Sequence, residues 1–199
     1  MPRQRCSQCL RPQNYCLCNL IPRLQSITRV LILQHPDETR HALNTARLAA
    51  LGLVNSELLI GENFDGLEQY WRDYSPWLLF PGEQALELEA AAQRPESLPR
   101  LLIVPDGTWR KARKLLHCNP ILAALPRLSL PQGLTSRYRL RKAPEAGALA
   151  TLEAIVHTLN GLEAPNRFDT LLLPFEALID GQIEAMGQAT FRRNHEIQP

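Results

Sequence analysis

Four cysteines near the N-terminus have the spacing of a metal site. Cys6, Cys9, Cys16 and Cys18 form two close pairs, C-x2-C followed six residues later by C-x-C. Four thiolates on a short segment can surround one tetrahedral ion, and closed sites of this kind hold structural Zn2+. The alternative is four reduced thiols in a mobile arm, but residues 1–25 contain few large apolar side chains that could bury them. The spacing therefore predicts a structural site for zinc or a similar thiophilic metal.

The arginines around this cluster have two interpretations. Arg3, Arg5 and Arg11 either balance the formal charge of −2 on a tetrathiolate zinc centre or present guanidinium groups to RNA phosphates. The sequence leaves both open. The fifth cysteine, Cys118, stands apart from the others and is interpreted as a small apolar filler.

A second group of chemically capable residues follows the apolar run 101–104, which predicts a buried strand. Ligands of open α/β sheets bind beyond the carboxyl ends of strands, so Asp106 is placed to accept a proton or to hold a cationic group. Gly107 permits backbone conformations closed to other residues, and Thr108 is a predicted helix N-cap. The alternatives are a turn residue for Asp106 and a core residue for Trp109, and for Trp109 alone the core is the better interpretation.

Side chains that could donate hydrogen bonds to RNA phosphates, most of them basic, form three groups. They are Arg40, Asn44 and Arg47; Arg110, Arg113 and Lys114; and Arg137, Arg139, Arg141 and Lys142. The first group has the i, i+4, i+7 spacing of one helix stripe. The arginines of the last group would share one face of an extended segment, with Tyr138 and Leu140 on the other face. The alternatives are a solvated helix face and an edge strand protected by charge.

The charge is segregated along the chain of 199 residues. The net charge of +2 would argue against a nucleic-acid partner. By segment, however, the charge is +5 over residues 1–47, −7 over 48–99, +9 over 100–142 and −5 over 143–199. The basic blocks contain the candidate RNA contacts. The apolar fraction of 45% excludes a disordered tail, and no apolar run reaches the ~20 residues that cross a bilayer. The sequence therefore predicts a cytoplasmic protein without membrane contact.

The elements that would position these residues alternate between strands and helices. Strands are expected at 29–34, 56–60, 76–80, 101–104, 127–130 and 168–173, and helices at 38–51, 67–74, 83–92, 108–117, 147–159 and 176–188. This alternation predicts an α/β domain with a mostly parallel sheet and helices on both faces. We expect this domain at residues 26–199, after the Cys-rich module of residues 1–25.

The motif D-x-T-W at 106–109 resembles the signature of the DTW-domain family. The resemblance extends to the cysteine cluster and to four further segments: His35-Pro36-x-Glu38, Asn44-Thr45-Ala46-Arg47, Ser136-Arg137-Tyr138-x-Leu140-Arg141 and Thr151-x-Glu153. The members that the chain most resembles are tRNA-uridine aminocarboxypropyltransferases. The family is related to the SPOUT enzymes, so the resemblance also implies a trefoil knot in the sheet domain.

The resemblance implies transfer of the 3-amino-3-carboxypropyl group of S-adenosylmethionine to N3 of a uridine in tRNA, in the variable loop, with release of 5′-methylthioadenosine. It implies catalytic roles for Asp106, Thr108 and Trp109. It implies cofactor contacts for Pro105, Gly107, Arg137, Tyr138, Leu140, Thr151 and Glu153. The expected partner is tRNA, without an obligate protein partner, for a monomer or homodimer. The alternatives are a SPOUT-type RNA methyltransferase and a non-catalytic, zinc-containing RNA-binding module.

The chemistry of the implied reaction assigns tasks to particular residues. The N3–H of uridine is a weak acid whose nitrogen attacks only after the proton leaves, so a nearby base is useful, and Asp106 is the first candidate. The carboxylate of the methionine tail needs an anchor, and Arg137 or Arg47 could supply it. The sulfonium itself drives the transfer, so zinc would be structural.

Overall fold

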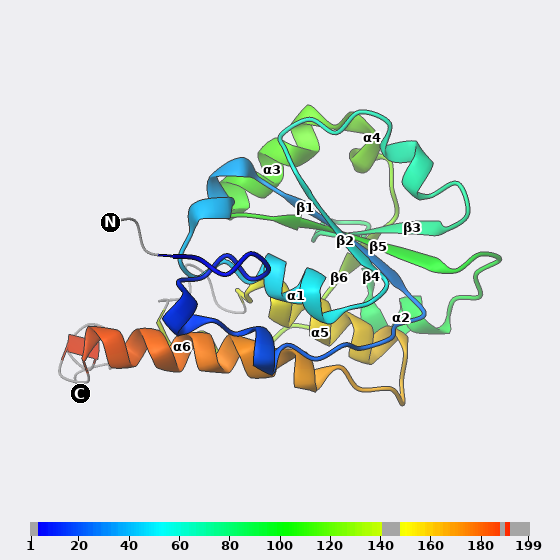
Figure 1. Ribbon diagram of the computed structural model, residues 1–199. Helices are drawn as coiled ribbons and strands as arrows, with labels where there is room; N and C mark the ends of the chain where they lie inside the picture. The colour runs from blue at the N-terminus through cyan, green and yellow to red at the C-terminus, as the bar shows by residue number, and fades with distance from the viewer. Residues whose placement is uncertain (1–3, 141–147, 188–189, 192–199) are drawn as a thin grey trace.

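A parallel sheet forms the centre of the protein (Figure 1). The computed structural model describes residues 4–140, 148–187 and 190–191. The strands are β1 (Arg29–Gln34), β2 (Ser56–Ile60), β3 (Ser75–Leu79), β4 (Leu86–Glu87), β5 (Arg100–Asp106) and β6 (Arg127–Ser129). Their order across the sheet is β2-β1-β5-β3-β6-β4, and all neighbours are parallel. The predicted α/β class is therefore confirmed.

Helices cover both faces of the sheet, as expected. The α-helices are α1 (Ala46–Gly52), α2 (Leu88–Gln93), α3 (Trp109–Cys118), α4 (Pro120–Ala123), α5 (Thr151–Leu162) and α6 (Leu173–Met186). On one face, Val30 and Ile32 of β1 pack in the cluster that contains the buried side chains of α1, α5 and α6. On the other face, Leu31 and Leu33 pack with the buried leucines of α3 and α4 (Figure 1). None of the helices in the described part of the chain is long and apolar enough to cross a membrane.

The strands predicted from bounded apolar runs are confirmed to within one or two residues for β1, β2, β3, β5 and β6. β5 extends two residues further than expected, so that Pro105 and Asp106 belong to the strand itself. The segment predicted as a helix at 83–92 instead forms the edge strand β4 and the shorter helix α2. Leu86 of β4 pairs with Leu128 of β6, and this sheet contact competes successfully with helix propensity.

The predicted helix at 38–51 is wrong, because the chain forms two separate pieces. A 3-10 helix, η3 (Pro36–Arg40), is followed by a loop, and α1 begins only at Ala46. The side chain of Asn44 replaces the missing helix bonds: its Nδ2 donates to the carbonyl of Glu38 (2.9 Å), and its Oδ1 accepts from the N–H of Arg47 (3.4 Å). Asparagine commonly breaks helices through such local bonds. Arg40, Asn44 and Arg47 therefore do not form one helix stripe.

The predicted strand at 168–173 is also wrong. This segment forms the 3-10 helix η5 (Asp169–Leu172), which runs directly into α6. Phe168, Leu171 and Leu172 are buried, so the apolar run was identified correctly as core but not as helical. A short apolar run fits either element equally well. Pro174 lies in the first turn of α6, where its missing N–H costs no helix bond.

Candidate active site and metal centre

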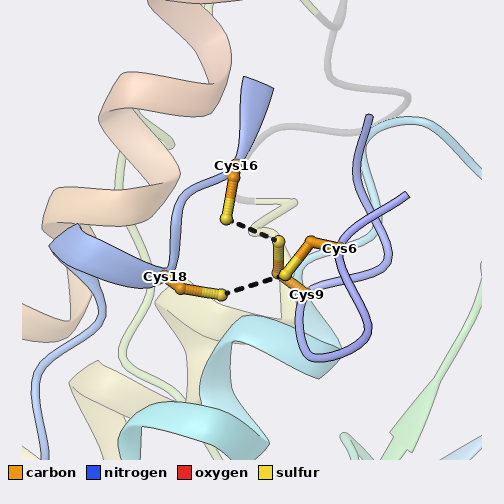
Figure 2. A group of neighbouring side chains, drawn as sticks. All are labelled: Cys6, Cys9, Cys16 and Cys18. Atoms are coloured by element: carbon orange, nitrogen blue, oxygen red, sulfur yellow. Dashed lines mark hydrogen bonds between the residues drawn. The ribbon is translucent and has the colours of Figure 1, made fainter. Parts of the chain in front are cut away.

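The four N-terminal cysteines converge on one point (Figure 2). Their Sγ atoms all lie within 4.8 Å of one another, with Cys6 Sγ 3.5 Å from Cys18 Sγ and Cys9 Sγ 3.8 Å from Cys16 Sγ. A tetrahedral zinc ion with Zn–S bonds of about 2.3 Å would place its sulfurs roughly 3.8 Å apart. The donor set and its spacing therefore fit a tetrathiolate zinc site.

The thiols of this cluster lie in unequal environments, which shift the pKa values of Cys6 and Cys18 in opposite directions. The backbone N–H groups of Cys9 and Gln8 lower the pKa of the Cys6 thiol to about 6. Desolvation, followed by the thiol contact with Cys6, raises the pKa of Cys18 to about 12. A cation at the centre would favour the thiolate form of every ligand, so metal binding would release protons.

Arg11 connects the cysteine cluster to the loop after η3. Its Nη1 donates to the carbonyl of Ala42 (2.7 Å) and its Nη2 to that of Asn44 (3.0 Å). Burial lowers the pKa of Arg11, and the charge of Cys9 partly offsets this effect. Nearby, Leu17 is buried in the same apolar cluster as the sheet. The cysteine segment thus rests directly on the sheet domain.

The carboxyl ends of β1 and β5 form a switch point, because the chain leaves them toward opposite sides of the sheet. β1 connects to β2 at one edge, whereas β5 connects to β6 beyond β3. Ligands of doubly wound sheets bind in the crevice at such points. Gln34 is the last residue of β1 and lies in register with Asp106, the last of β5. The predicted site residue Asp106 is therefore at the position that the topology favours.

The carboxylate of Asp106 is buried and accepts two hydrogen bonds. Gln34 Nε2 donates to its Oδ2 (2.7 Å), and Thr151 Oγ1 donates to its Oδ1 (2.5 Å). Desolvation raises the pKa of Asp106, and the bonds from Thr151 and Gln34 offset part of that rise. A carboxylate with a raised pKa is a stronger base than one in water, so this environment suits proton abstraction.

Two adjoining cavities open at this end of the sheet, and Gly107, Thr108, Leu149 and Thr151 line both. We call the first, of about 480 Å3, the polar cavity; Asp106 is part of its wall. We call the second, of about 560 Å3, the apolar cavity; it is lined largely by carbon, from residues including Phe80, Trp109 and Leu130. Together they could hold an amphipathic ligand beside a second, polar one.

An ion pair closes one side of the polar cavity. Lys111 Nζ lies 2.7 Å from Glu38 Oε1, and this contact raises the pKa of Lys111. The backbone of Gly107 passes close to both, with φ +154°, and a Cβ built there would lie 2.9 Å from Lys111 Cβ. Only glycine fits this approach. The pair therefore sets one charge of each sign next to the Asp106 carboxylate.

Trp109 is not a core residue, contrary to the interpretation favoured for it alone. It is the first residue of α3, is 37% exposed and packs edge-to-face on Phe80, with ring centroids 5.7 Å apart. Both rings line the apolar cavity. Thr108 precedes it as the predicted N-cap, and its Oγ1 accepts from the N–H of Lys111 (3.4 Å). The motif 106–109 thus contributes to both cavities.

Glu153 organises the other wall and does not line either cavity. Its buried carboxylate accepts from Ser136 Oγ (2.7 Å), from the N–H of Arg137 (2.6 Å) and from the N–H of Ala150 (2.8 Å). These bonds hold the segment before Tyr138 against the start of α5. The predicted cofactor contacts Pro105, Gly107, Tyr138, Leu140 and Thr151 do line one or both cavities.

The segment 136–140 is not an extended strand, contrary to the expected alternation. Its residues form a loop in which the N–H of Arg139 donates to the carbonyl of Arg137 (2.9 Å). Arg137 pairs with Glu176 of α6 at 2.5 Å, and Arg139 pairs with Asp180. Both guanidinium groups are thereby directed to α6. The predicted RNA contacts Arg141 and Lys142 lie outside the described residues.

The remaining predicted RNA contacts fall on two surfaces. Arg110, Arg113 and Lys114 are exposed on α3, where Lys114 forms an ion pair with Glu62 at 2.7 Å. Arg40, Asn44 and Arg47 all line a third cavity next to the cysteine cluster, despite the break in their helix. The structure thus keeps the first predicted group together by a loop instead of a helix face.

Sequence reasoning missed Gln34, Lys111 and Phe80 as site residues. Gln34 is the polar last residue of an apolar strand, and it neither caps a helix nor forms a turn. A polar side chain at that position was the signal that could have identified it as a site residue. Lys111 is one of several basic residues that follow Trp109, and its position in the sequence does not distinguish it from them. Phe80 follows β3, and only the strand order brings it beside Trp109.

Comparison with known proteins identifies relatives over nearly the whole chain. The family model of the DTW domain matches residues 3–183. The tRNA-uridine aminocarboxypropyltransferase 2 of Macaca fascicularis is 32% identical over 206 residues, which cover 98% of this chain and 69% of that protein. The protein of the same name from Drosophila melanogaster is 30% identical over 193 residues, covering 92% and 76%. The tRNA-uridine aminocarboxypropyltransferase A of Arabidopsis thaliana is 28% identical over 193 residues, covering 81% and 73%. No solved structure matches the chain.

Proposed function

The chain belongs to the DTW-domain family, and on that premise we propose that it is a tRNA-uridine aminocarboxypropyltransferase. The donor is S-adenosylmethionine, and the acceptor is N3 of a uridine in the variable loop of tRNA. The single observation that supports this assignment best is the buried Asp106 carboxylate in the wall of the polar cavity, which adjoins the apolar cavity. It lies where a base is needed beside an amphipathic donor. The cytoplasmic location expected from the sequence is part of this proposal.

We assign the adenosine of the donor to the apolar cavity. Phe80 and Trp109 offer aromatic faces and edges there, and aromatic side chains provide much of the binding energy of flat heterocycles. The methionine tail then reaches the polar cavity across Thr108 and Thr151, which line both. In that cavity Lys111 can attract the carboxylate of the tail and Glu38 its ammonium group.

The ion pairs weaken the case for Arg137 as the carboxylate anchor. Its guanidinium binds Glu176 of α6 and does not line either cavity. Arg47 lines the third cavity instead. Lys111 therefore replaces both as our candidate anchor, with Arg137 retained in a positioning role through its N–H bond to Glu153.

The transfer step then balances without a redox partner. Asp106 accepts the proton from uridine N3, and the nitrogen lone pair forms the N3–Cγ bond. The Cγ–S bond breaks, and its electrons neutralise the sulfonium, so that 5′-methylthioadenosine leaves as a thioether. The residues around the site orient the two substrates and accept the proton. Because the sulfonium already activates the donor, these two effects provide most of the catalysis. Zinc takes no part in this step and stabilises the N-terminal segment.

Incubation of the protein with S-adenosylmethionine and an unmodified tRNA transcript tests the proposal. Nucleoside mass analysis should detect aminocarboxypropyluridine and an equal amount of methylthioadenosine. S-adenosylhomocysteine together with a methylated nucleoside would identify a SPOUT-type methyltransferase instead. tRNA binding without any product would indicate a non-catalytic RNA-binding module. The trefoil knot and the division into residues 1–25 and 26–199 remain predictions.

A further inference from the structure

A groove separates the cysteine cluster from α6. This third cavity has a volume of about 490 Å3, and we call it the N-terminal groove. Its walls come from the N-terminal segment, from the end of η3, the loop after it and the start of α1, and from one side of α6. They include Arg5, Arg11, Tyr15, Arg40, Arg47 and Gln182. Figure 1 shows the N-terminal segment (blue) beside α6 (orange) on this side of the molecule. His41 and Asn44 line both the groove and the polar cavity, so the two are neighbours.

The groove is lined by positive charge. Its described lining residues include four arginines and no aspartate or glutamate. Around the polar cavity, by comparison, some of the described cations are paired with carboxylates, as in Lys111–Glu38 and Arg139–Asp180. Within the described chain, by contrast, no carboxylate lies within 4.0 Å of the guanidinium of Arg40. The charge of Arg40 is therefore available to a ligand.

One of the four arginines already has a structural task. Arg11 is half-buried beside Cys9 and donates to two backbone carbonyls, so its charge offsets that of the cysteine cluster. Arg47 is held by a weaker bond to the carbonyl of Gln8 (3.4 Å) and still lines the groove. Arg11 therefore balances the cluster, as one of the two interpretations of the N-terminal arginines holds, and Arg5 lines the groove. Arg3 lies outside the described residues.

Tyr15 adds an aromatic surface to this cationic groove. It ends the 3-10 helix η1 (Gln13–Tyr15) and is 50% exposed. Single-stranded RNA is held in proteins by stacking of its bases on exposed aromatic rings, with arginines on the phosphates. An exposed tyrosine alone is unremarkable. An exposed ring in a groove lined by arginines without acidic residues matches this mode of recognition.

We propose that the N-terminal groove binds a nucleotide of the tRNA strand adjacent to the target uridine, with its base on Tyr15 and its phosphate on Arg40 and Arg47. This inference rests on the proposed function, which places the target uridine in the polar cavity. A base that reacts at N3 must be unpaired and turned out of its stack. Its neighbour in the strand then enters the next concavity, and His41 and Asn44 are the boundary between the two.

Equilibrium binding tests the groove without requiring catalysis. The zinc-loaded, full-length protein is titrated into a labelled transcript of a tRNA with a uridine in its variable loop, and anisotropy is followed at several salt concentrations. Tyr15→Ala should raise Kd about tenfold, whereas Tyr15→Phe should keep the affinity because the stacking face remains. Arg40→Ala should raise Kd and should lower the slope of log Kd against log salt by about one.

The matched control is Arg72→Ala. Arg72 is exposed and lies just before β3, at the amino-terminal ends of the strands, whereas the cavities lie at their carboxyl ends. If Tyr15→Ala and Arg40→Ala bind tRNA as Arg72→Ala does, no nucleotide occupies the groove and the proposal is overturned. If the wild type binds through Tyr15 and Arg40 but yields no aminocarboxypropyluridine, the proposed function fails while the groove stands. If Tyr15→Ala reacts with unchanged KM for tRNA, the groove fails while the function stands.

Discussion

Replacement of Asp106 by asparagine separates the chemistry of its carboxylate from its structural role. Asparagine has the same shape and can keep both local bonds: its Oδ1 accepts from Gln34 Nε2, and its Nδ2 donates to the hydroxyl of Thr151 after that hydroxyl rotates. The bonds lose the strength that ionisation adds, but the protein no longer buries a charge. We therefore expect a change of at most about 1 kcal/mol in the free energy of unfolding.

Catalysis should respond far more strongly than stability. Loss of a positioned base typically costs ~10²- to 10⁴-fold in rate, and kcat for aminocarboxypropyl transfer should fall by that factor. The Kd for tRNA should stay unchanged, because Asp106 is buried. The matched control is Asp73→Asn, an exposed residue before β3, which should retain wild-type kcat. Single-turnover measurement of methylthioadenosine release provides the assay. An unchanged kcat in Asp106→Asn would refute the assignment of the base.

The pH dependence of stability offers a second test of the same residue. Burial raises the pKa of Asp106 above the value of about 3.9 expected in the unfolded chain. Its contribution to stability is therefore fully present below the unfolded pKa and is lost as the pH rises through the folded pKa. Asparagine has no such loss. The difference in Tm, Asp106→Asn minus wild type, should become more positive from acid to neutral pH. A constant difference would contradict the raised pKa.

Three further substitutions test the parts that surround the base. Cys9→Ser should abolish stoichiometric zinc in elemental analysis and lower Tm, because Cys9 is the buried ligand, whereas Cys118→Ser should keep the metal. Glu153→Gln removes one of the oxygen acceptors around which the backbone donors are buried, and it should lower the free energy of unfolding by about 1–3 kcal/mol in urea titration. Its control is Glu176→Gln, which removes an exposed ion pair and should lower that free energy by at most ~1 kcal/mol. Trp109→Ala should raise the Kd for S-adenosylmethionine about tenfold in calorimetry with Tm nearly unchanged, because the ring is partly exposed and lines the apolar cavity. The metal site would be contradicted if Cys9→Ser kept as much zinc as Cys118→Ser. The role of Glu153 would be contradicted if Glu153→Gln and Glu176→Gln had equal urea midpoints. The donor site would be contradicted if Trp109→Ala bound S-adenosylmethionine as tightly as the wild type.

The strands β1, β2, β3, β5 and β6 were predictable from sequence because each is a short apolar run between polar or turn-forming residues, whereas β4 was predicted as part of a helix. His35-Pro36 follows directly on β1, and the polar residues at the end of β5 and just after it mark the candidate site. The cysteine cluster was likewise predictable, since four thiols within a short segment can reach one ion regardless of the fold. These inferences depend on local chemistry and on the general rule for strand ends.

What escaped prediction depends on particular contacts that the hydrophobic pattern does not show. The bond from Gln34 to Asp106 requires β1 and β5 to be neighbours, and the strand order could not be read from local patterns. The break before α1 depends on the side chain of Asn44 binding backbone groups on both sides of it. The role of Glu153 depends on a loop that approaches α5 from far along the chain. The bonds of Asp106 and Glu153 join segments that are separated in the chain, whereas the Asn44 bonds are local and override the helical pattern.

The central position of β5 also has a consequence for how the chain folds. Among the described strands, the hydrogen-bonded neighbours of β3 are β5 and β6, and both follow it in the chain. While the chain is being synthesised from its N-terminus, β1 and β2 can pair early, but β3 has no strand partner until β5 emerges. Pairing of distant parallel strands is slow because the loops between them must close first. The same late event that joins the two halves of the sheet brings Asp106 against Gln34, so the reactive carboxylate is buried only in a chain that has completed its core.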